Sequence, residues 1–220
     1  MTRIVYLHGF ASTPLSTKAQ FFKRKFEGVD FEIPQLDQGD FQKLTITGQL
    51  GIIDQAVRGE RVFLMGSSLG GYLAALYAAR HANVERLVLM APALEFPTRW
   101  RNRFSAAEMT EWRQSGARGF YHYGYKQDRP LGYAFVEDAL QYEDAPDFAQ
   151  PALMLHGSHD DVVPPEVSVR FAARHPNVMV KLLDSGHELT DVLEQLWSET
   201  AAFFGFKAGL QSGFQKLETR

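Results

Sequence analysis

Residues 61–81 read RVFLMGSSLGGYLAALYAARH, and this stretch decides the fold. Its apolar first part predicts a buried strand, and its alanine-rich second half predicts a helix. Between them lies Gly66-Ser67-Ser68-Leu69-Gly70-Gly71, in which the glycines leave room for a sharp turn around Ser68. Such a turn presents a serine oxygen to a substrate, so Ser68 is the candidate nucleophile. The alternative is a glycine-rich turn in which Ser67 or Ser68 only caps the helix.

Strand-like and helix-like segments alternate along most of the chain, as they do in a parallel sheet with crossover helices. We therefore expect an α/β fold, a three-layer sandwich with a mostly parallel sheet of about six strands. One domain would span residues 1–206, and residues 207–220 would form a polar tail. The expected strands are residues 4–7, 31–33, 61–65, 86–90, 152–155 and 178–183, and the expected helices are 17–27, the segment before Gly59, 69–81 and a last helix with Leu189 to Phe204 on one face and Gly205 as its stop.

Residues 96–148 break this alternation. They hold twelve of the 28 aromatic residues (17 Phe, 8 Tyr, 3 Trp), an enrichment that fits a cap inserted over a pocket. The alternative is that these rings only pack the insertion against the sheet. Ser105 and Glu108 predict a capping box at the start of a short helix. Tyrosines alternating from Tyr121 predict a hairpin whose turn is Asp128-Arg129-Pro130.

The basic run Arg99-Trp100-Arg101-Asn102-Arg103 opens this insertion. It could recognise an anionic group of a substrate, although such a run is usually a solvated face. The whole chain carries a formal net charge of -3, which does not favour nucleic acid or an anionic membrane as a partner. The chain has no cysteine, which excludes a thiolate nucleophile. The apolar run before His8 is too short for a signal-peptide core or a membrane span, so we expect a soluble cytoplasmic protein.

The segment His156-Gly157-Ser158-His159-Asp160-Asp161-Val162-Val163-Pro164 follows a late strand. A loop in this place can supply the acid that orients a catalytic histidine. Asp160 is favoured, because an acid directly before Val-Val-Pro more often faces solvent or caps the next helix, but Asp161 stays an alternative. A metal site is a weaker interpretation, since no matching ligand pair lies close by. His156 is expected to be a satisfied histidine at the strand end.

Asp184-Ser185-Gly186-His187 lies between the last strand and the last helix. A histidine on such a loop can reach over the sheet edge, and the near-neutral pKa of imidazole suits proton transfer in both directions. The order serine, aspartate, histidine, each after a strand, is typical of the α/β-hydrolase arrangement. Ser68, Asp160 and His187 are therefore the candidate catalytic residues.

The loop Leu7-His8-Gly9-Phe10-Ala11-Ser12 follows the first strand. Acyl transfer needs two donors for the developing oxyanion, and the serine turn supplies one from the Leu69 amide. The second is expected from the Phe10 amide, with Gly9 allowing the backbone to come close. An ordinary strand-ending turn is the alternative.

Together these motifs resemble the α/β-hydrolase superfamily over residues 8–187. The opening YLHGFASTPLSTKAQFF is similar to short bacterial esterases of the YqiA type, and the aspartate loop and insertion resemble acyl-protein thioesterase relatives. The resemblance implies cofactor-free hydrolysis of a small-molecule ester or thioester, with Ser68, Asp160 and His187 as triad and Phe10 and Leu69 as oxyanion donors. A peptidase or amidase with the same triad, or a non-catalytic binding protein, are the alternatives. The sequence leaves acyl length and oligomeric state open.

Overall fold

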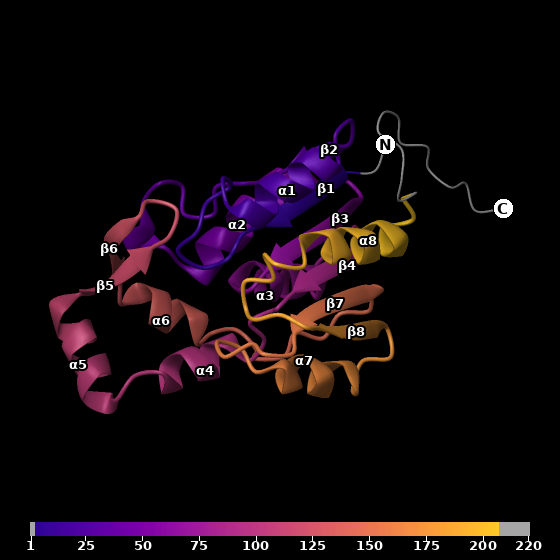
Figure 1. Cartoon of the computed structure of the whole chain (residues 1–220). Coiled ribbons are helices and arrows are strands. Elements are labelled where there is room, and N and C mark those ends of the chain that lie inside the picture. The colour runs from indigo at the N-terminus through magenta and orange to yellow at the C-terminus, as the bar shows by residue number, and fades with distance from the viewer. Residues whose placement is uncertain (1–2, 207–220) are drawn as a thin grey trace.

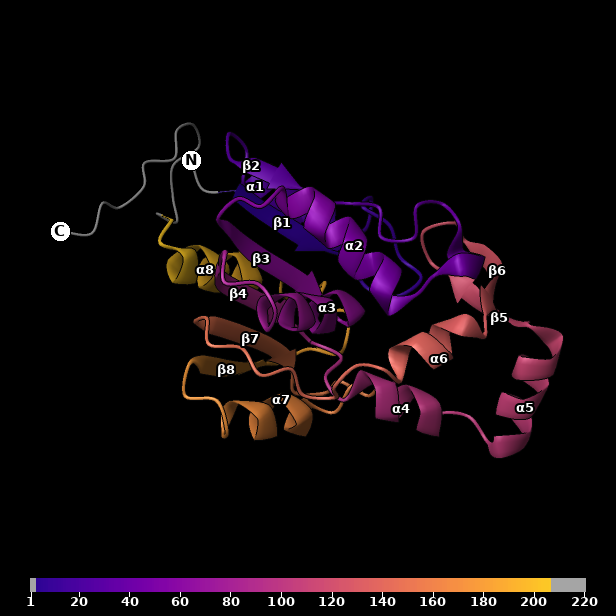
Figure 2. The same cartoon turned by 180° about the vertical axis from the view of Figure 1, so that it is seen from behind.

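The computed structural model describes residues 3–206, which form a parallel sheet with helices on both faces (Figures 1 and 2). The six strands lie in the order β2-β1-β3-β4-β7-β8, and every neighbouring pair is parallel. This arrangement confirms the predicted α/β-hydrolase fold class. The strands are β1 (Arg3–Leu7), β2 (Asp30–Glu32), β3 (Val62–Ser67), β4 (Val84–Met90), β7 (Ala152–Gly157) and β8 (Val178–Leu183).

Helices bury an apolar cluster on each face of the sheet. On one face Phe22 and Trp197 belong to the cluster under α1 and α8, and on the other Ile53 and Leu73 belong to the cluster under α2, α3 and α7. The inner strands are buried on both faces, which explains their continuous apolar runs. The helices are α1 (Thr17–Lys25), α2 (Ile46–Val57), α3 (Leu69–Ala78), α7 (Pro165–Ala172) and α8 (Leu193–Phe204).

The parallel sheet brings the candidate site together. All six strands end at the same edge, so the loops after β1, β3, β7 and β8 meet there although they are far apart in the sequence. These four loops carry the four motifs singled out above.

The last helix begins later than the sequence pattern predicted. α8 starts at Leu193. Leu189 is not part of it, because the left-handed backbone at Leu189 (φ 53°) is incompatible with a right-handed helix. Its side chain is nevertheless buried in the same apolar cluster as α8, which is why it fitted the helical spacing. Gly205 ends the helix in a left-handed conformation (φ 80°), as predicted. The predicted tail over residues 207–220 lies outside the described residues.

The predicted insertion consists of three helices and a hairpin that lie beyond the carboxyl ends of the strands (Figures 1 and 2). The capping box is present, because the Glu108 amide donates to Ser105 Oγ at 3.3 Å and the Ser105 amide donates to Glu108 Oε2 at 2.9 Å. The elements are α4 (Phe96–Asn102), α5 (Ala106–Ser115), β5 (Ala117–His122), β6 (Gln127–Gly132) and α6 (Ala134–Ala139). We call this group the cap.

The hairpin is present, but its predicted turn is wrong. The chain turns over residues 123–126, where the His122 carbonyl accepts from the amides of Tyr125 (3.1 Å) and Lys126 (2.7 Å). The segment Asp128-Arg129-Pro130 lies inside β6, with Pro130 paired opposite Gly119. A two-stranded sheet tolerates this proline, because each of its strands has one unpaired edge.

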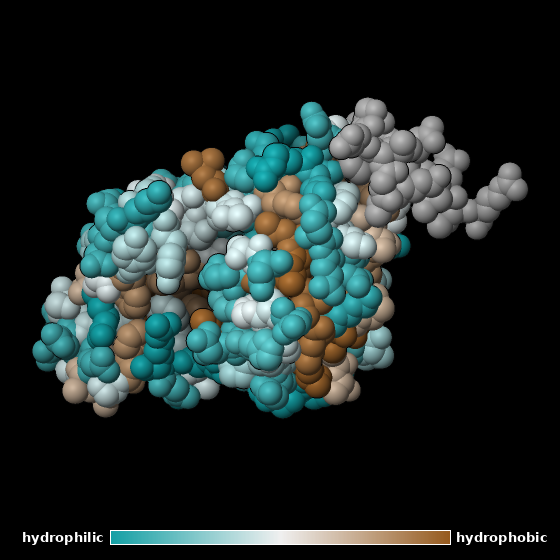
Figure 3. Space-filling model, viewed as in Figure 1, coloured by the Kyte–Doolittle hydropathy of each residue, from teal (hydrophilic) through white to brown (hydrophobic). Residues whose placement is uncertain are grey.

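The face in Figure 3 is hollowed between the cap and the sheet, with hydrophobic residues in part of the hollow. Of the helices formed within residues 3–206, none is long and apolar enough to cross a membrane.

Candidate active site

Ser68 stands at a strained turn between β3 and α3. Its backbone has φ 54° and ψ −119°, a conformation that residues with a side chain rarely adopt. The glycines on either side are required by close packing. A Cβ on Gly66 would lie 2.3 Å from the Gly70 carbonyl oxygen, and one on Gly70 would lie 2.1 Å from the Leu7 carbonyl oxygen. The turn therefore exposes the serine only because the backbone can approach this closely.

Replacing Gly70 with alanine is expected to lower the free energy of unfolding by about 1–3 kcal/mol, because the new methyl group overlaps the backbone of β1. Urea unfolding followed by circular dichroism measures the change. Gly51→Ala is the control: an added Cβ at Gly51 in α2 meets nothing within 4 Å. That variant should gain up to about 1 kcal/mol from helix propensity. Equal stability of the Gly70 variant and the wild type would contradict the packing.

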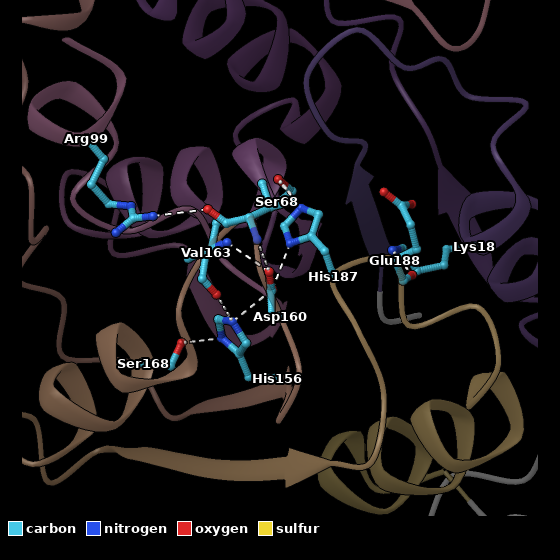
Figure 4. A network of polar contacts seen from close by, with 10 residues as sticks. Lys18, Ser68, Arg99, His156, Asp160, Val163, Ser168, His187 and Glu188 are labelled. Carbon is cyan, nitrogen blue, oxygen red and sulfur yellow. Dashed lines mark hydrogen bonds and ion pairs between the residues drawn. The ribbon is translucent and has the colours of Figure 1, made fainter. Parts of the chain in front are cut away.

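Three side chains from three separate loops form a hydrogen-bonded chain (Figure 4). Ser68 Oγ lies 3.0 Å from His187 Nε2, and His187 Nδ1 lies 2.7 Å from Asp160 Oδ2. A carboxylate can only accept, so Nδ1 carries the ring proton of the neutral histidine and Nε2 is left to accept the serine proton. The structure therefore brings together the three residues singled out as catalytic candidates.

Asp160 is fully hydrogen-bonded in a buried place. Its Oδ1 accepts from the amides of Val162 (2.9 Å) and Val163 (2.8 Å), and its Oδ2 accepts from His187 and from His156 Nε2 at 3.1 Å. Burial raises the pKa of Asp160, but hydrogen bonds from His156, His187 and the Val163 amide outweigh it and hold the pKa well below the usual range. Asp161, the alternative acid, is exposed.

His156 is the satisfied strand-end histidine that the sequence suggested. Its Nδ1 accepts from Ser168 Oγ at 2.8 Å, and its Nε2 faces the Val163 carbonyl oxygen at 2.9 Å as well as Asp160. His159 turns away to pair with Asp184 at the surface. Within residues 3–206 no three side chains of His, Asp or Glu are grouped so that they could hold a metal ion.

Two basic residues hold the loops of this site from outside. Lys18, buried on α1, donates through Nζ to the carbonyl oxygen of Glu188, the residue after His187. Burial lowers the pKa of this lysine. Arg99 donates to the Val162 carbonyl oxygen at 3.0 Å, while Arg101 and Arg103 are exposed. Lys18 lies within the opening stretch YLHGFASTPLSTKAQFF, but sequence reasoning missed its contact, because that contact joins residues 170 positions apart.

The amides of Phe10 and Leu69 are the two expected oxyanion donors. Neither donates a hydrogen bond to an acceptor in the described part of the chain. Leu69 is the first residue of α3, where backbone N–H groups are free. Gly9 brings the first loop against the serine, since a Cβ on it would lie 3.5 Å from Ser68 Cβ. We call residues 9–12 the oxyanion loop, after the role that the sequence predicts for the Phe10 amide.

The cap packs its aromatic rings on this loop. The Phe10 ring lies 4.9 Å from Trp100, 5.7 Å from Phe120 and 5.8 Å from Phe135, measured between ring centroids. Phe41, outside the cap, lies 5.3 Å from the same ring. These three of the cap's aromatic residues therefore pack it against the loop beside Ser68.

His8, just before the oxyanion loop, is buried with both ring nitrogens engaged. Nδ1 donates to the Gly9 carbonyl oxygen at 3.0 Å, and Nε2 accepts from the Leu36 amide at 3.3 Å. This pattern requires the neutral ring. Burial lowers the pKa of His8 to about 4.

The unfolded chain should therefore take up a proton on His8 that the folded chain refuses. The pKa of His8 in the unfolded chain is about 6.5, so above that pH His8 does not lower the free energy of unfolding. As the pH drops from 7 to 4, His8 lowers the free energy of unfolding by about 3 kcal/mol. Urea unfolding at pH 7 and pH 4 measures the loss of unfolding free energy between them. In His8→Gln that loss should be smaller than in the wild type by about 3 kcal/mol. The exposed His159→Gln variant is the control and should keep the full loss. An unchanged pH dependence in His8→Gln would contradict the burial argument.

The fold and the Ser-His-Asp geometry define a protein of the α/β-hydrolase fold class, and the predicted resemblance to that superfamily is confirmed. The chain belongs to the family described as "Uncharacterised protein family (UPF0227)", which it matches over residues 3–205. No curated protein sequence matches it.

Solved structures that share this fold include the following three proteins. Alpha/beta hydrolase domain-containing protein 10 from mouse is 19% identical, covering 91% of this chain and 88% of that one, with a TM-score of 0.77. Est1E from Butyrivibrio proteoclasticus is 20% identical over 92% and 88%, with a TM-score of 0.71. The monoacylglycerol lipase from Paleococcus ferrophilus is 19% identical over 90% and 96%, with a TM-score of 0.65. At these identities the similarity establishes the fold alone.

Proposed function

We propose that this protein is a serine hydrolase that cleaves a carboxylic ester or thioester through an acyl-enzyme on Ser68. The observation that carries the proposal is the chain of contacts from Ser68 Oγ to His187 (3.0 Å) and from His187 to Asp160 (2.7 Å). In this account His187 Nε2 takes the serine proton as Oγ attacks the carbonyl carbon. Asp160 holds the ring in the required tautomer and stabilises its charged form.

The oxygen of the tetrahedral intermediate would lie between the amides of Leu69 and Phe10. Each such donor is worth about 3 kcal/mol of barrier in acyl transfer. His187 then returns the proton to the leaving alcohol or thiol, and a water molecule activated by the same histidine releases the acid. No step requires a cofactor.

The surroundings of the oxyanion loop support an apolar acyl group. The rings of Phe10, Trp100 and Phe120 lie together on the cap side of the loop, so a charged group there would lose its water without a partner. Among the proteins of the same fold, one structure is titled as Est1E with ferulic acid bound and another as a monoacylglycerol lipase. Both titles agree with ester chemistry on this scaffold.

The same triad also serves peptidases and amidases. The amine that leaves an amide substrate is a poorer leaving group than an alcohol or thiol, so these enzymes need a more effective general acid. Steady-state rates with p-nitrophenyl esters, acyl thioesters and aminoacyl amides separate the classes. We expect kcat/KM for esters or thioesters to exceed that for amides by at least about 100-fold, a barrier difference of about 2.7 kcal/mol. Turnover of the amides alone would overturn the substrate class. A cytoplasmic location stays a prediction.

A further inference from the structure

A pocket lies behind the oxyanion loop, apart from the hydrogen-bonded chain of Ser68. It is bounded by that loop, by the segment after β2, by α2 and by β5 of the cap hairpin. It has room for about one water molecule. We call it the loop pocket, and the residues that matter below are Asp37, Gln49 and His122.

These three side chains each present a buried polar atom with no hydrogen-bond partner among the described residues. The atoms are Asp37 Oδ2, Gln49 Oε1 and His122 Nε2, and the exposed fractions of the residues are 6%, 3% and 0%. An unsatisfied buried polar group costs about 1–3 kcal/mol, so native proteins contain few of them. Three in one small pocket point to a bound group.

The other side-chain polar atoms of Asp37 and His122 are already engaged, which fixes what these two residues offer to a bound group. Asp37 Oδ1 accepts from the Gly39 amide at 2.9 Å and from Gln35. His122 Nδ1 accepts from the Tyr125 amide at 3.2 Å, so the neutral ring carries its proton on Nε2. Nε2 is 3.5 Å from Asp37 Oδ2, which is longer than an effective direct hydrogen bond. With Gln49 Oε1, the three unpartnered atoms are one donor, His122 Nε2, and two acceptors.

We propose that the loop pocket is a binding site for a single hydroxyl group, supplied by an ordered water molecule or by the substrate. A water molecule can accept from His122 Nε2 and donate to both Asp37 Oδ2 and Gln49 Oε1. A substrate hydroxyl can accept from the same donor and donate to one of the acceptors. The carboxylate of Asp37 disfavours an anionic group in the pocket. The volume of the pocket excludes a group larger than one hydroxyl or one water molecule.

The position of the site gives the bound group a role in the reaction. Gly9 and Phe10 line the pocket, and Gly9 also lies against Ser68, so a group in the pocket supports the loop that carries the Phe10 amide. The cap hairpin meets the same loop, because the Gly124 amide donates to the Ala11 carbonyl oxygen at 3.5 Å. A Cβ on Gly124 would also lie 2.2 Å from Cγ2 of Thr13, the residue after the loop. His122 therefore links the cap to the oxyanion loop through the bound group.

The water source is tested by crystal structures of the ligand-free wild type and of Gln49→Leu. We expect an electron-density peak within hydrogen-bonding distance of Asp37 Oδ2, Gln49 Oε1 and His122 Nε2, and its loss in the variant. Gln42→Leu, at an exposed position, is the control and should keep the peak. Thermal unfolding checks that both variants fold. If Gln49→Leu does not fold, His122→Phe takes its place and removes the donor of the pocket.

The substrate source is tested by p-nitrophenyl esters of hydroxyacyl chains against unsubstituted chains of equal length, and this arm rests on the proposed function. We expect a preference of about tenfold in kcat/KM for one hydroxyl position, equivalent to about 1.4 kcal/mol, and its loss in Gln49→Leu. A density peak without any preference assigns the site to water. A wild type with neither peak nor preference overturns the proposal. A peak in a protein that hydrolyses no ester overturns the proposed function and leaves this site standing.

Discussion

Ser68→Ala is expected to lower kcat for ester hydrolysis by about 10⁴- to 10⁶-fold, because no other group can form the acyl-enzyme. The binding surface stays intact, so KM should change little. Within the described residues the Ser68 hydroxyl is hydrogen-bonded to His187 Nε2 alone, so the fold does not depend on it. Steady-state rates with a p-nitrophenyl ester measure kcat and KM, and thermal unfolding of the same preparation checks that the fold is intact.

Ser67 provides a matched control one residue away. It ends β3 and is buried, with its hydroxyl hydrogen-bonded to Tyr6 and not to His187. Ser67→Ala should keep activity within about tenfold of the wild type, and its cost should appear in stability, at about 1 kcal/mol for a lost hydrogen bond. Equal loss of kcat in Ser67→Ala and Ser68→Ala would contradict the assignment of Ser68 as the nucleophile.

Asp160→Asn is expected to lower kcat by about 10⁴-fold, because it reverses the histidine tautomer. The amide oxygen would take the place of Oδ1, which accepts from the amides of Val162 and Val163. The NH₂ group would then face His187 Nδ1 and donate to it. The ring proton moves to Nε2, which can no longer accept the proton of Ser68.

Asp161→Asn is the control, because Asp161 is exposed and does not contact His187. Its kcat should stay within about twofold of the wild type, since surface changes away from the reacting groups have small effects. Pre-steady-state rates with the ester measure acylation in both variants. A larger loss in the Asp161 variant than in the Asp160 variant would contradict the assignment.

The sequence alone predicted the parts of this protein that depend on local chemistry and on chain order. Gly66 and Gly70 predict the turn at Ser68, since any side chain there would overlap backbone. The parallel sheet then brings Asp160 and His187 to the same edge, because each follows a strand.

What the sequence could not predict depends on contacts between distant segments. Leu189 matched the helical spacing because its side chain joins the same cluster, although its backbone is left-handed. The hairpin turn was misplaced because the Asp-Arg-Pro pattern favours a turn, whereas Pro130 is tolerated in a two-stranded sheet. No pattern in the sequence connects Lys18, Asp37, Gln49 or His122 with the site, since only the folded chain brings them there.

The most direct test of the account is labelling with a fluorophosphonate, which reacts with an activated serine oxygen. We expect one adduct per chain of the wild type, mapped by peptide mass spectrometry to Ser68, and none in Ser68→Ala. An unlabelled wild type, or an adduct that persists in Ser68→Ala, would contradict the claim that His187 and Asp160 activate this serine.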